Sequence, residues 1–220
     1  MEIKTHHIAT PKTARYTAYG ELSSKTKYFW FVLHGSNMLS EQMLYKFKDF
    51  DPETHFVIAP EGLSRFYVNG FGGEVVASWM TKRDRLEEIH DFSVYCSTLY
   101  DSYVQKLPDS CKTIIMGFSQ GGVTAMRWLH HLDVTVDFLI PYACWIPEDI
   151  DYSTAKTDWN KICKILTYGS EDQFLNEKKI IEIQEICKAG NLDFHNEIYA
   201  GDHRVDKKQL KKIFKQYIEH

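Results

Sequence analysis

The chain has 220 residues, of which 44% are apolar and 25% are charged, and its formal net charge is −4 at pH 7. These values are typical of a globular protein with a substantial core. They exclude the strongly basic surface that binds nucleic acid or an anionic membrane. No apolar run approaches the roughly 20 residues of a membrane-spanning helix. No linker, repeat or low-complexity tract interrupts the chain, so we predict one domain over residues 1–220.

The cysteines and the first residues point to a reducing compartment. The five cysteines are widely spaced and include no CxxC pair, which argues against a structural zinc site. The opening residues MEIKTHHIATPK contain no apolar stretch of the kind found in a secretory signal. We therefore predict free thiols, a cytoplasmic protein and no metal or other cofactor.

Short apolar runs alternate along the chain with helical patterns. Residues 3–8 and 14–19 are predicted to form an antiparallel edge hairpin. Six runs bounded by glycine or proline follow, at residues 28–33, 55–59, 113–116, 137–140, 162–168 and 194–199. Pro141 is expected to end the fourth run. Such nearly continuous apolar runs are typical of parallel strands that are covered on both faces.

The helices between these runs have recognisable ends. Thr81 and Asp84 resemble a capping box, which predicts a helix from there to about Lys106. Asn176 is expected to cap a second helix that ends at Gly190. The last helix has one apolar face and one lysine-rich face, which we interpret as buried and solvated.

This alternation predicts an α/β fold, with a doubly wound, mostly parallel sheet and helices on both of its faces. Functional residues of such sheets gather at the carboxyl ends of the strands. At one such end, Gly117-Phe118-Ser119-Gln120-Gly121 fits the pattern G-x-S-x-G between a strand and a helix. In that setting a sharp turn exposes the Ser119 hydroxyl as a nucleophile. The alternative is that Ser119 only caps the following helix.

A serine nucleophile needs a base and an orienting carboxylate, in the chain order Ser, acid, His. Asp172 follows the fifth apolar run and His203 follows the sixth. Glu171 and Asp202 are rival acids, and we prefer Asp172.

A tetrahedral intermediate also needs two donors for its oxyanion. The backbone N–H of Gln120 lies at the start of the helix that follows Ser119. The backbone N–H of Ser36 lies in the loop after the first parallel strand, where Gly35 lets the main chain come close.

These segments resemble the phospholipase/carboxylesterase family of α/β-hydrolases, which includes the acyl-protein thioesterases. The resemblance lies in GFSQGG, LHGS, the acid of YGSEDQF, GDH near the end, and Ser78-Trp79. It implies Ser119, Asp172 and His203 as a catalytic triad, with the N–H groups of Ser36 and Gln120 as the oxyanion hole. It also implies an α/β-hydrolase fold without a large cap domain and, in many members, a homodimer.

Aromatic side chains follow several of the predicted strands. Trp79 and Phe71 belong to a long, glycine-containing loop over residues 61–79, which is predicted to be mobile, while Trp145 and Phe174 follow later strands. We predict that these four residues form an apolar rim that binds an acyl or aromatic group. The alternative is that they only cover the end of the sheet.

The predicted function is that of a serine carboxylic-ester hydrolase that works through an acyl-enzyme. Its substrates would be short- to medium-chain or aromatic esters, or thioesters, as small molecules. Two alternatives stay open at this stage: a small serine peptidase, and a catalytically silent relative that only binds a ligand.

Overall fold

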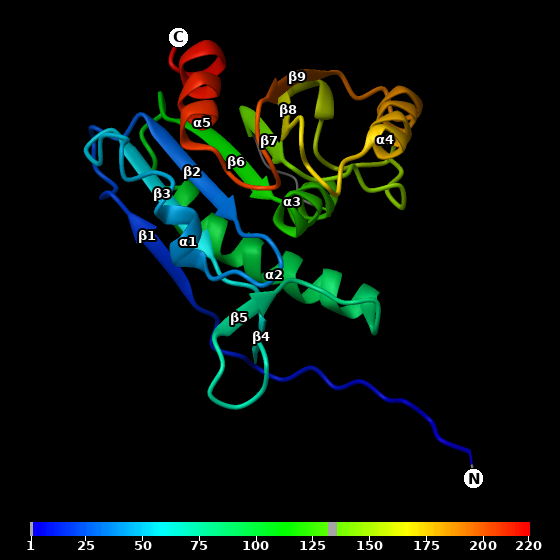
Figure 1. Cartoon of the computed structure of the whole chain (residues 1–220). Coiled ribbons are helices and arrows are strands. Elements are labelled where there is room, and N and C mark those ends of the chain that lie inside the picture. Colours follow the sequence, from blue (N-terminus) through cyan, green and yellow to red (C-terminus); the bar gives the residue numbers. More distant parts are fainter. Residues whose placement is uncertain (1, 132–135) are drawn as a thin grey trace.

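The computed structural model describes residues 2–131 and 136–220 (Figure 1). Its strands are β1 (Tyr16–Tyr19), β2 (Tyr28–Leu33), β3 (His55–Pro60), β4 (Ser64–Tyr67), β5 (Val75–Ser78), β6 (Lys112–Phe118), β7 (Phe138–Tyr142), β8 (Cys163–Gly169) and β9 (Phe194–Tyr199). Its helices are α1 (Ser40–Leu44), α2 (Arg85–Val104), α3 (Gln120–His131), α4 (Glu177–Ala189) and α5 (Lys207–Ile213), with a 3₁₀ turn η1 (Trp159–Lys161) and a π-helical turn η2 (Phe214–Ile218) that continues α5.

Seven strands form one sheet in the order β1-β3-β2-β6-β7-β8-β9. All neighbours pair in parallel except β1, which runs antiparallel to β3. Helices α2 and α3 lie on one face of the sheet, and α1 and α5 lie on the other (Figure 1). The predicted doubly wound α/β fold is confirmed, and no large cap domain interrupts the described chain. This topology brings the carboxyl ends of β2, β6, β8 and β9 to one end of the sheet.

Strand β2 shows why the sheet is covered twice. Phe29 and Phe31 pack against aromatic rings of α2 and α3, with the Phe31 and Trp128 centroids 4.7 Å apart. Trp30, between them, faces the other way and packs near Phe214, which follows α5. Because side chains alternate between the faces of a strand, a strand buried on both sides has to be apolar throughout.

Strand β7 continues through Pro141, where the sequence predicts that it ends. Pro141 pairs with Gly117 of β6. On the other side, the ladder with β8 includes Leu139 and Tyr142 but skips the two residues between them. Proline has no N–H to donate, so one side of the ladder is interrupted while the strand itself stays extended.

The predicted N-terminal hairpin is wrong in its first half. Only β1 forms, at the antiparallel edge, and residues 2–13 contain no strand. Ile3 and Ile8, which suggested a strand, are largely exposed. Their apolar side chains have no buried surface to pack against, so the alternating pattern alone does not make a strand.

Helix α2 begins at Arg85, and the predicted capping box does not form. Asp84 is the N-cap residue but has a φ of 48° and makes no capping hydrogen bond. The Thr81 hydroxyl instead accepts from the Arg83 N–H, and the Glu88 carboxylate accepts from the Thr81 hydroxyl.

Within the described chain no helix, α2 included, is long and apolar enough to cross a membrane.

The start of α4 follows the prediction. The Asn176 side chain accepts a hydrogen bond from the Lys179 N–H, at 3.0 Å, and Gly190 is the C-cap residue. This bond satisfies one of the N–H groups that the first turn of a helix leaves without an acceptor. Asparagine is among the preferred residues for the N-cap position, which is why the sequence predicted the start of α4.

The expected long loop over residues 61–79 is instead a two-stranded antiparallel hairpin of β4 and β5. It projects from the sheet (Figure 1). Its base is attached to the body of the protein by an isolated bridge between Met38 and Ala77. The turn between the strands uses positive φ at Asn69, Gly70 and Gly72, a conformation that glycine and asparagine adopt at little cost.

Candidate active site

The turn between β6 and α3 holds Ser119 in a strained conformation with a φ of 51°. The turn is so tight that a Cβ on Gly117 would lie 2.2 Å from the Gly121 carbonyl oxygen. A Cβ on Gly121 would lie 2.3 Å from the carbonyl oxygen of Leu33. Only glycine fits at these two positions, so the spacing G-x-S-x-G follows from the close approach of strand, turn and helix.

Ser119, His203 and Asp172 lie in one chain of hydrogen bonds. His203 Nδ1 is 2.7 Å from Asp172 Oδ2, and His203 Nε2 is 3.0 Å from Ser119 Oγ. An ionised carboxylate only accepts, so Nδ1–H donates to Asp172 and Nε2 is left to accept from the serine hydroxyl. The arrangement therefore provides a route for the Ser119 proton to reach Nε2.

Asp172 is the acid that the structure brings to His203. Its side chain is fully buried, and its second oxygen accepts from the Phe174 N–H at 2.9 Å. The rivals Glu171 and Asp202 are exposed, and Asp202 forms an ion pair with Arg204 at 3.0 Å. Sequence spacing alone did not separate these acids, because all of them follow strands at the same end of the sheet.

Two aromatic rings flank the His203 imidazole. The Phe118 centroid is 4.9 Å from it, and the Phe174 ring meets it edge-on at 4.7 Å. The His203 side chain keeps only 16% of its surface exposed. Because water is displaced from around the ring, its hydrogen bonds with Asp172 and Ser119 lie in a medium of lower dielectric than water.

The two predicted oxyanion donors come from neighbouring strand ends. Leu33 pairs with Gly117, so the loops after β2 and β6 begin side by side. Gln120 is the first residue of α3, and the first N–H groups of a helix have no acceptor within it. Ser36 is exposed in the loop after β2. Both N–H groups thus belong to segments that meet beside Ser119.

The buried ring of His34 lies below this loop. Its Nε2 accepts from the Gly62 N–H at 2.9 Å, and its Nδ1 lies 2.7 Å from the Gly35 carbonyl oxygen. A backbone N–H can only donate, so the ring must be neutral with its proton on Nδ1. Burial lowers the pKa of His34 to about 4, in agreement with that tautomer. His34 follows β2 directly, and its contacts with Gly35 and Gly62 depend on the packing of loops that sequence spacing does not specify.

A family model described as phospholipase/carboxylesterase matches residues 33–220. The chain belongs to the phospholipase/carboxylesterase family. This confirms the resemblance carried by GFSQGG, LHGS and GDH, and it places the protein among phospholipase- and carboxylesterase-like hydrolases. The matched segment includes β2's end, the turn at Ser119, and the strand ends that precede Asp172 and His203.

Solved structures of this phospholipase/carboxylesterase fold are similar over almost the whole chain. Acyl-protein thioesterase 2 of Zea mays has a TM-score of 0.70 at 17% identity, covering 92% of this chain and 97% of that one. A phospholipase/carboxylesterase from Dyadobacter fermentans has a TM-score of 0.69 at 13% identity, covering 94% and 98%. Esterase PE8 has a TM-score of 0.67 at 17% identity, covering 94% and 99%. No curated protein matches the sequence. At these identities the likeness shows the fold.

The four residues predicted to form an apolar rim lie in different places. Phe174, 57% exposed, lies beside His203. Trp145 follows β7 and is 40% exposed. Phe71 is fully exposed at the end of the β4–β5 hairpin, where its ring lies near Tyr67. Trp79 is only 2% exposed, so it is a core residue below the site. Of the four, the structure brings Phe174 into contact with His203.

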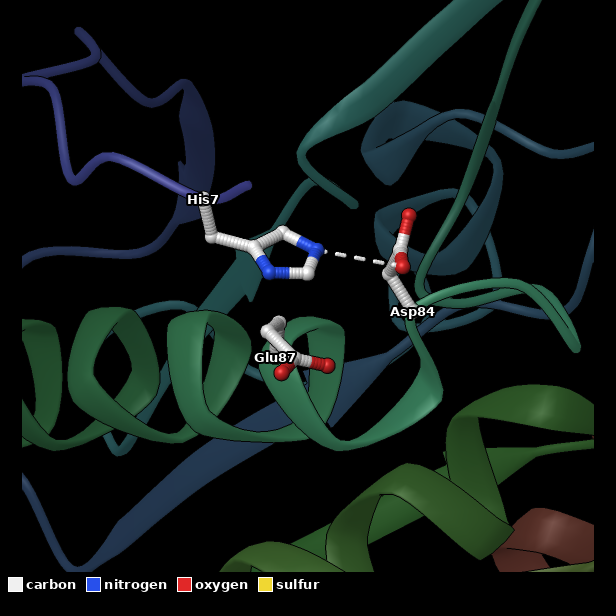
Figure 2. Close-up of side chains that lie close together, drawn as sticks. All are labelled: His7, Asp84 and Glu87. Atoms are coloured by element: carbon white, nitrogen blue, oxygen red, sulfur yellow. Dashed lines mark hydrogen bonds and ion pairs between the residues drawn. The ribbon is translucent and has the colours of Figure 1, made fainter. Parts of the chain in front are cut away.

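One group of potential metal ligands is found within residues 2–131 and 136–220: His7, Asp84 and Glu87 (Figure 2). Their ligand atoms lie within 4.8 Å of one another, and all three residues are exposed. His7 Nε2 is 3.1 Å from Asp84 Oδ1, which is an ordinary surface ion pair when the histidine is protonated. The group joins the N-terminal arm (residues 2–13) to the start of α2 and includes none of Ser119, Asp172 and His203.

Two buried histidines are expected to make the stability of the protein depend on pH. Burial lowers the pKa of both His34 and His55 from 6.5 to about 4. In the unfolded chain these two histidines bind protons below about pH 6.5, whereas in the folded protein they do so only below about pH 4. We expect the free energy of unfolding to fall as the pH drops through this window, by roughly 3 kcal/mol for His34, with a further decrease from His55. Below about pH 4 both states are protonated and this contribution no longer changes.

The contribution of His55 can be separated by His55→Gln, since an amide oxygen can still accept from Trp30 Nε1, whose bond to His55 is 3.0 Å long. Urea unfolding at pH 7, 6 and 5 is expected to give a smaller loss of stability for the variant than for the native protein. Loss of ring packing lowers the variant's stability at every pH, so the change with pH is the informative quantity. Equal changes in the two proteins would contradict the prediction.

Proposed function

We propose that this protein is a serine ester hydrolase, with Ser119 as nucleophile, His203 as general base and acid, and Asp172 as the orienting carboxylate. The observation that carries the proposal is the unbroken chain of hydrogen bonds from Ser119 Oγ through the imidazole to Asp172, at 3.0 and 2.7 Å. Geometry of this kind is how a triad is recognised, whatever the fold. Membership of the phospholipase/carboxylesterase family supports the reaction class.

The first half of the proposed reaction forms an acyl-enzyme. His203 Nε2 takes the hydroxyl proton as Ser119 Oγ attacks the ester carbonyl carbon. The carbonyl oxygen becomes an oxyanion that accepts from the N–H groups of Ser36 and Gln120. The intermediate then collapses, the acyl–oxygen or acyl–sulfur bond breaks, and the leaving alcohol or thiol takes the proton from His203.

Water completes the reaction in the second half. His203 Nε2 accepts a proton from water as its oxygen attacks the acyl carbon, and the same proton returns to Ser119 Oγ when the acid leaves. Asp172 stays ionised throughout and stabilises the imidazolium that forms twice in each cycle. Its full burial and its bond from the Phe174 N–H hold it in the one orientation that this role requires.

The proposed substrates are short- to medium-chain or aromatic esters, with thioesters as an alternative of the same chemistry. The supporting feature is the apolar ring of Phe174, which is 57% exposed and in contact with His203. An acyl or aromatic group bound at the triad would bury this ring. Trp145 and Phe71 remain predictions as further contacts.

The test is hydrolysis of 4-nitrophenyl esters from acetyl to palmitoyl, followed by mass spectrometry of protein quenched during turnover. We expect hydrolysis with a clear preference for one range of chain lengths. We also expect a mass increase equal to the acyl group on the peptide that contains Ser119. Absence of hydrolysis at every chain length would overturn the esterase proposal and favour the peptidase or the silent binder.

A further inference from the structure

The side chain of Gln120 holds the segment that follows β5. Its Oε1 accepts from the Ser78 hydroxyl at 3.1 Å and from the Trp79 N–H at 3.0 Å, and its Nε2 donates to the Met80 carbonyl at 2.8 Å. The Gln120 amide thus uses both lone pairs of its oxygen and one of its two N–H groups to bind residues 78–80. The residue that would contribute one oxyanion donor through its main chain thus also seats Trp79 through its side chain.

Trp79 in turn holds the loop that carries the other donor. Its indole N–H donates to the His34 carbonyl oxygen at 2.8 Å, and its ring lies 5.0 Å from the His34 ring between centroids. Both residues are buried, at 2% and 0% exposure. Removing the indole N–H would therefore leave a buried carbonyl without this donor, which is costly.

The His34 side chain in turn contacts the next peptide group of this loop. Its Nδ1–H donates to the Gly35 carbonyl, while the Gly62 N–H keeps the ring in that tautomer. The Gly35 carbonyl and the Ser36 N–H belong to the same planar peptide and point in opposite directions. Whatever fixes the direction of that carbonyl therefore also fixes the direction of the Ser36 N–H.

We propose that Trp79, seated by the Gln120 side chain, is a positioning residue that aims the Ser36 N–H at the oxyanion through His34. The inference rests on the proposed function, since it assigns Trp79 a role in that reaction. It also couples the two donors: Gln120 supplies one directly and holds the other through Trp79. The sequence suggested that Trp79 lines the acyl site, and its burial gives it this different task.

The test is Trp79→Phe, which keeps an aromatic ring against His34 and removes the indole N–H. Loss of an oxyanion donor costs roughly 10²–10³ in kcat, so loosening one should cost roughly 10- to 100-fold. KM should change less than about 3-fold, because the oxyanion is absent from the ground state. The inhibition constant of a trifluoromethyl ketone, which forms a tetrahedral oxyanion on the serine, should rise by the same factor as KM/kcat.

A matched control is Trp128→Phe. Trp128 is equally buried, and its indole N–H donates to the Ser97 hydroxyl at 3.0 Å, on the side of the sheet that α2 and α3 cover. The substitution removes the same group from the same kind of environment without touching the oxyanion loop. We expect kcat to stay within about 2-fold of native. An equal loss of kcat in both variants would mean general loosening of the core and would overturn the proposal.

Gln120→Met provides a second route to the same result, because it keeps the side-chain length and removes all three hydrogen bonds. It should also lower kcat, and Trp79→Phe combined with it should lower kcat by less than the product of the two single effects. A strictly multiplicative loss would overturn the connection between the two residues. If thermal unfolding shows that Trp79→Phe does not fold, Gln120→Met alone decides, with unchanged kcat as the overturning result.

Failure of the positioning role is distinguishable from failure of the esterase proposal. If the native protein hydrolyses esters through Ser119 but Trp79→Phe keeps native kcat and ketone affinity, only the positioning role is overturned. If the native protein shows no hydrolysis that depends on Ser119, the proposed function fails and the positioning role fails with it.

Discussion

Ser119→Ala is expected to lower ester hydrolysis by roughly 10⁴-fold or more. The substitution removes the attacking oxygen, and no other group takes its place at His203 Nε2, which lies 3.0 Å from Ser119 Oγ. Any remaining rate would come from the oxyanion donors and from substrate binding. The measurement is initial rates with the preferred 4-nitrophenyl ester, with the native protein assayed beside the variant.

The fold should survive this change. Ser119 N–H donates to the Tyr142 carbonyl and Ser119 O accepts from the Gly122 N–H, and these main-chain bonds do not depend on the side chain. The melting temperature is therefore expected to stay close to native. Ser102→Ala is a suitable control, since its hydroxyl only donates to the Leu99 carbonyl within α2. A Ser119→Ala protein that folds and retains native activity would refute the serine mechanism.

Asp172→Asn is expected to lower kcat by roughly 10⁴-fold with little change in shape. The amide oxygen can accept from the Phe174 N–H, but the amide NH₂ then faces His203 Nδ1. Since that NH₂ only donates, it favours the tautomer with the proton on Nε2, which cannot take a proton from Ser119. Turning the amide over repairs this contact only by setting NH₂ against the Phe174 N–H.

The rival acids supply matched controls for this prediction. Glu171→Gln and Asp202→Asn remove the same charge from exposed side chains within the same end of the sheet. We expect both to keep kcat within about 3-fold of native. The measurement is the rate of hydrolysis of the preferred ester by all three variants across pH 5–9. A large loss in Asp202→Asn together with near-native activity in Asp172→Asn would move the orienting role to Asp202.

Local chemistry explains why much of the fold was predictable. Residues 28–33 form an apolar run, and residues 194–199 end just before the turn at Gly201. Both strands lie where the sequence predicts them. Asn176 caps α4 because its side chain satisfies a main-chain N–H only three residues away. The predictions that were wrong depended on contacts that the local sequence pattern does not specify. Thr81 bonds Glu88 in place of the expected box, and the apolar residues of the N-terminal arm have no surface to cover them.

The hairpin over residues 61–79 shows the same limit. Its glycines and aromatics suggested a mobile loop, but β4 pairs with β5, and Ala77 exchanges main-chain hydrogen bonds with Asn37 and Met38. Pairing of this kind depends on which edge the topology leaves open, and local propensity does not encode that. The predicted single domain, homodimer and cytoplasmic location remain predictions.

By itself the sequence determined the fold class and the family, and it predicted Ser119, a following acid and His203 as site residues, because each follows a strand in a fixed order. Only the tertiary structure showed which acid contacts His203 and that Trp79 is buried against the His34 carbonyl. Asp172 differs from its rivals in burial and in its partner, and the indole N–H of Trp79 donates to a carbonyl 45 residues away. Contacts between residues far apart in sequence come from the packing of the whole sheet, which no local pattern contains.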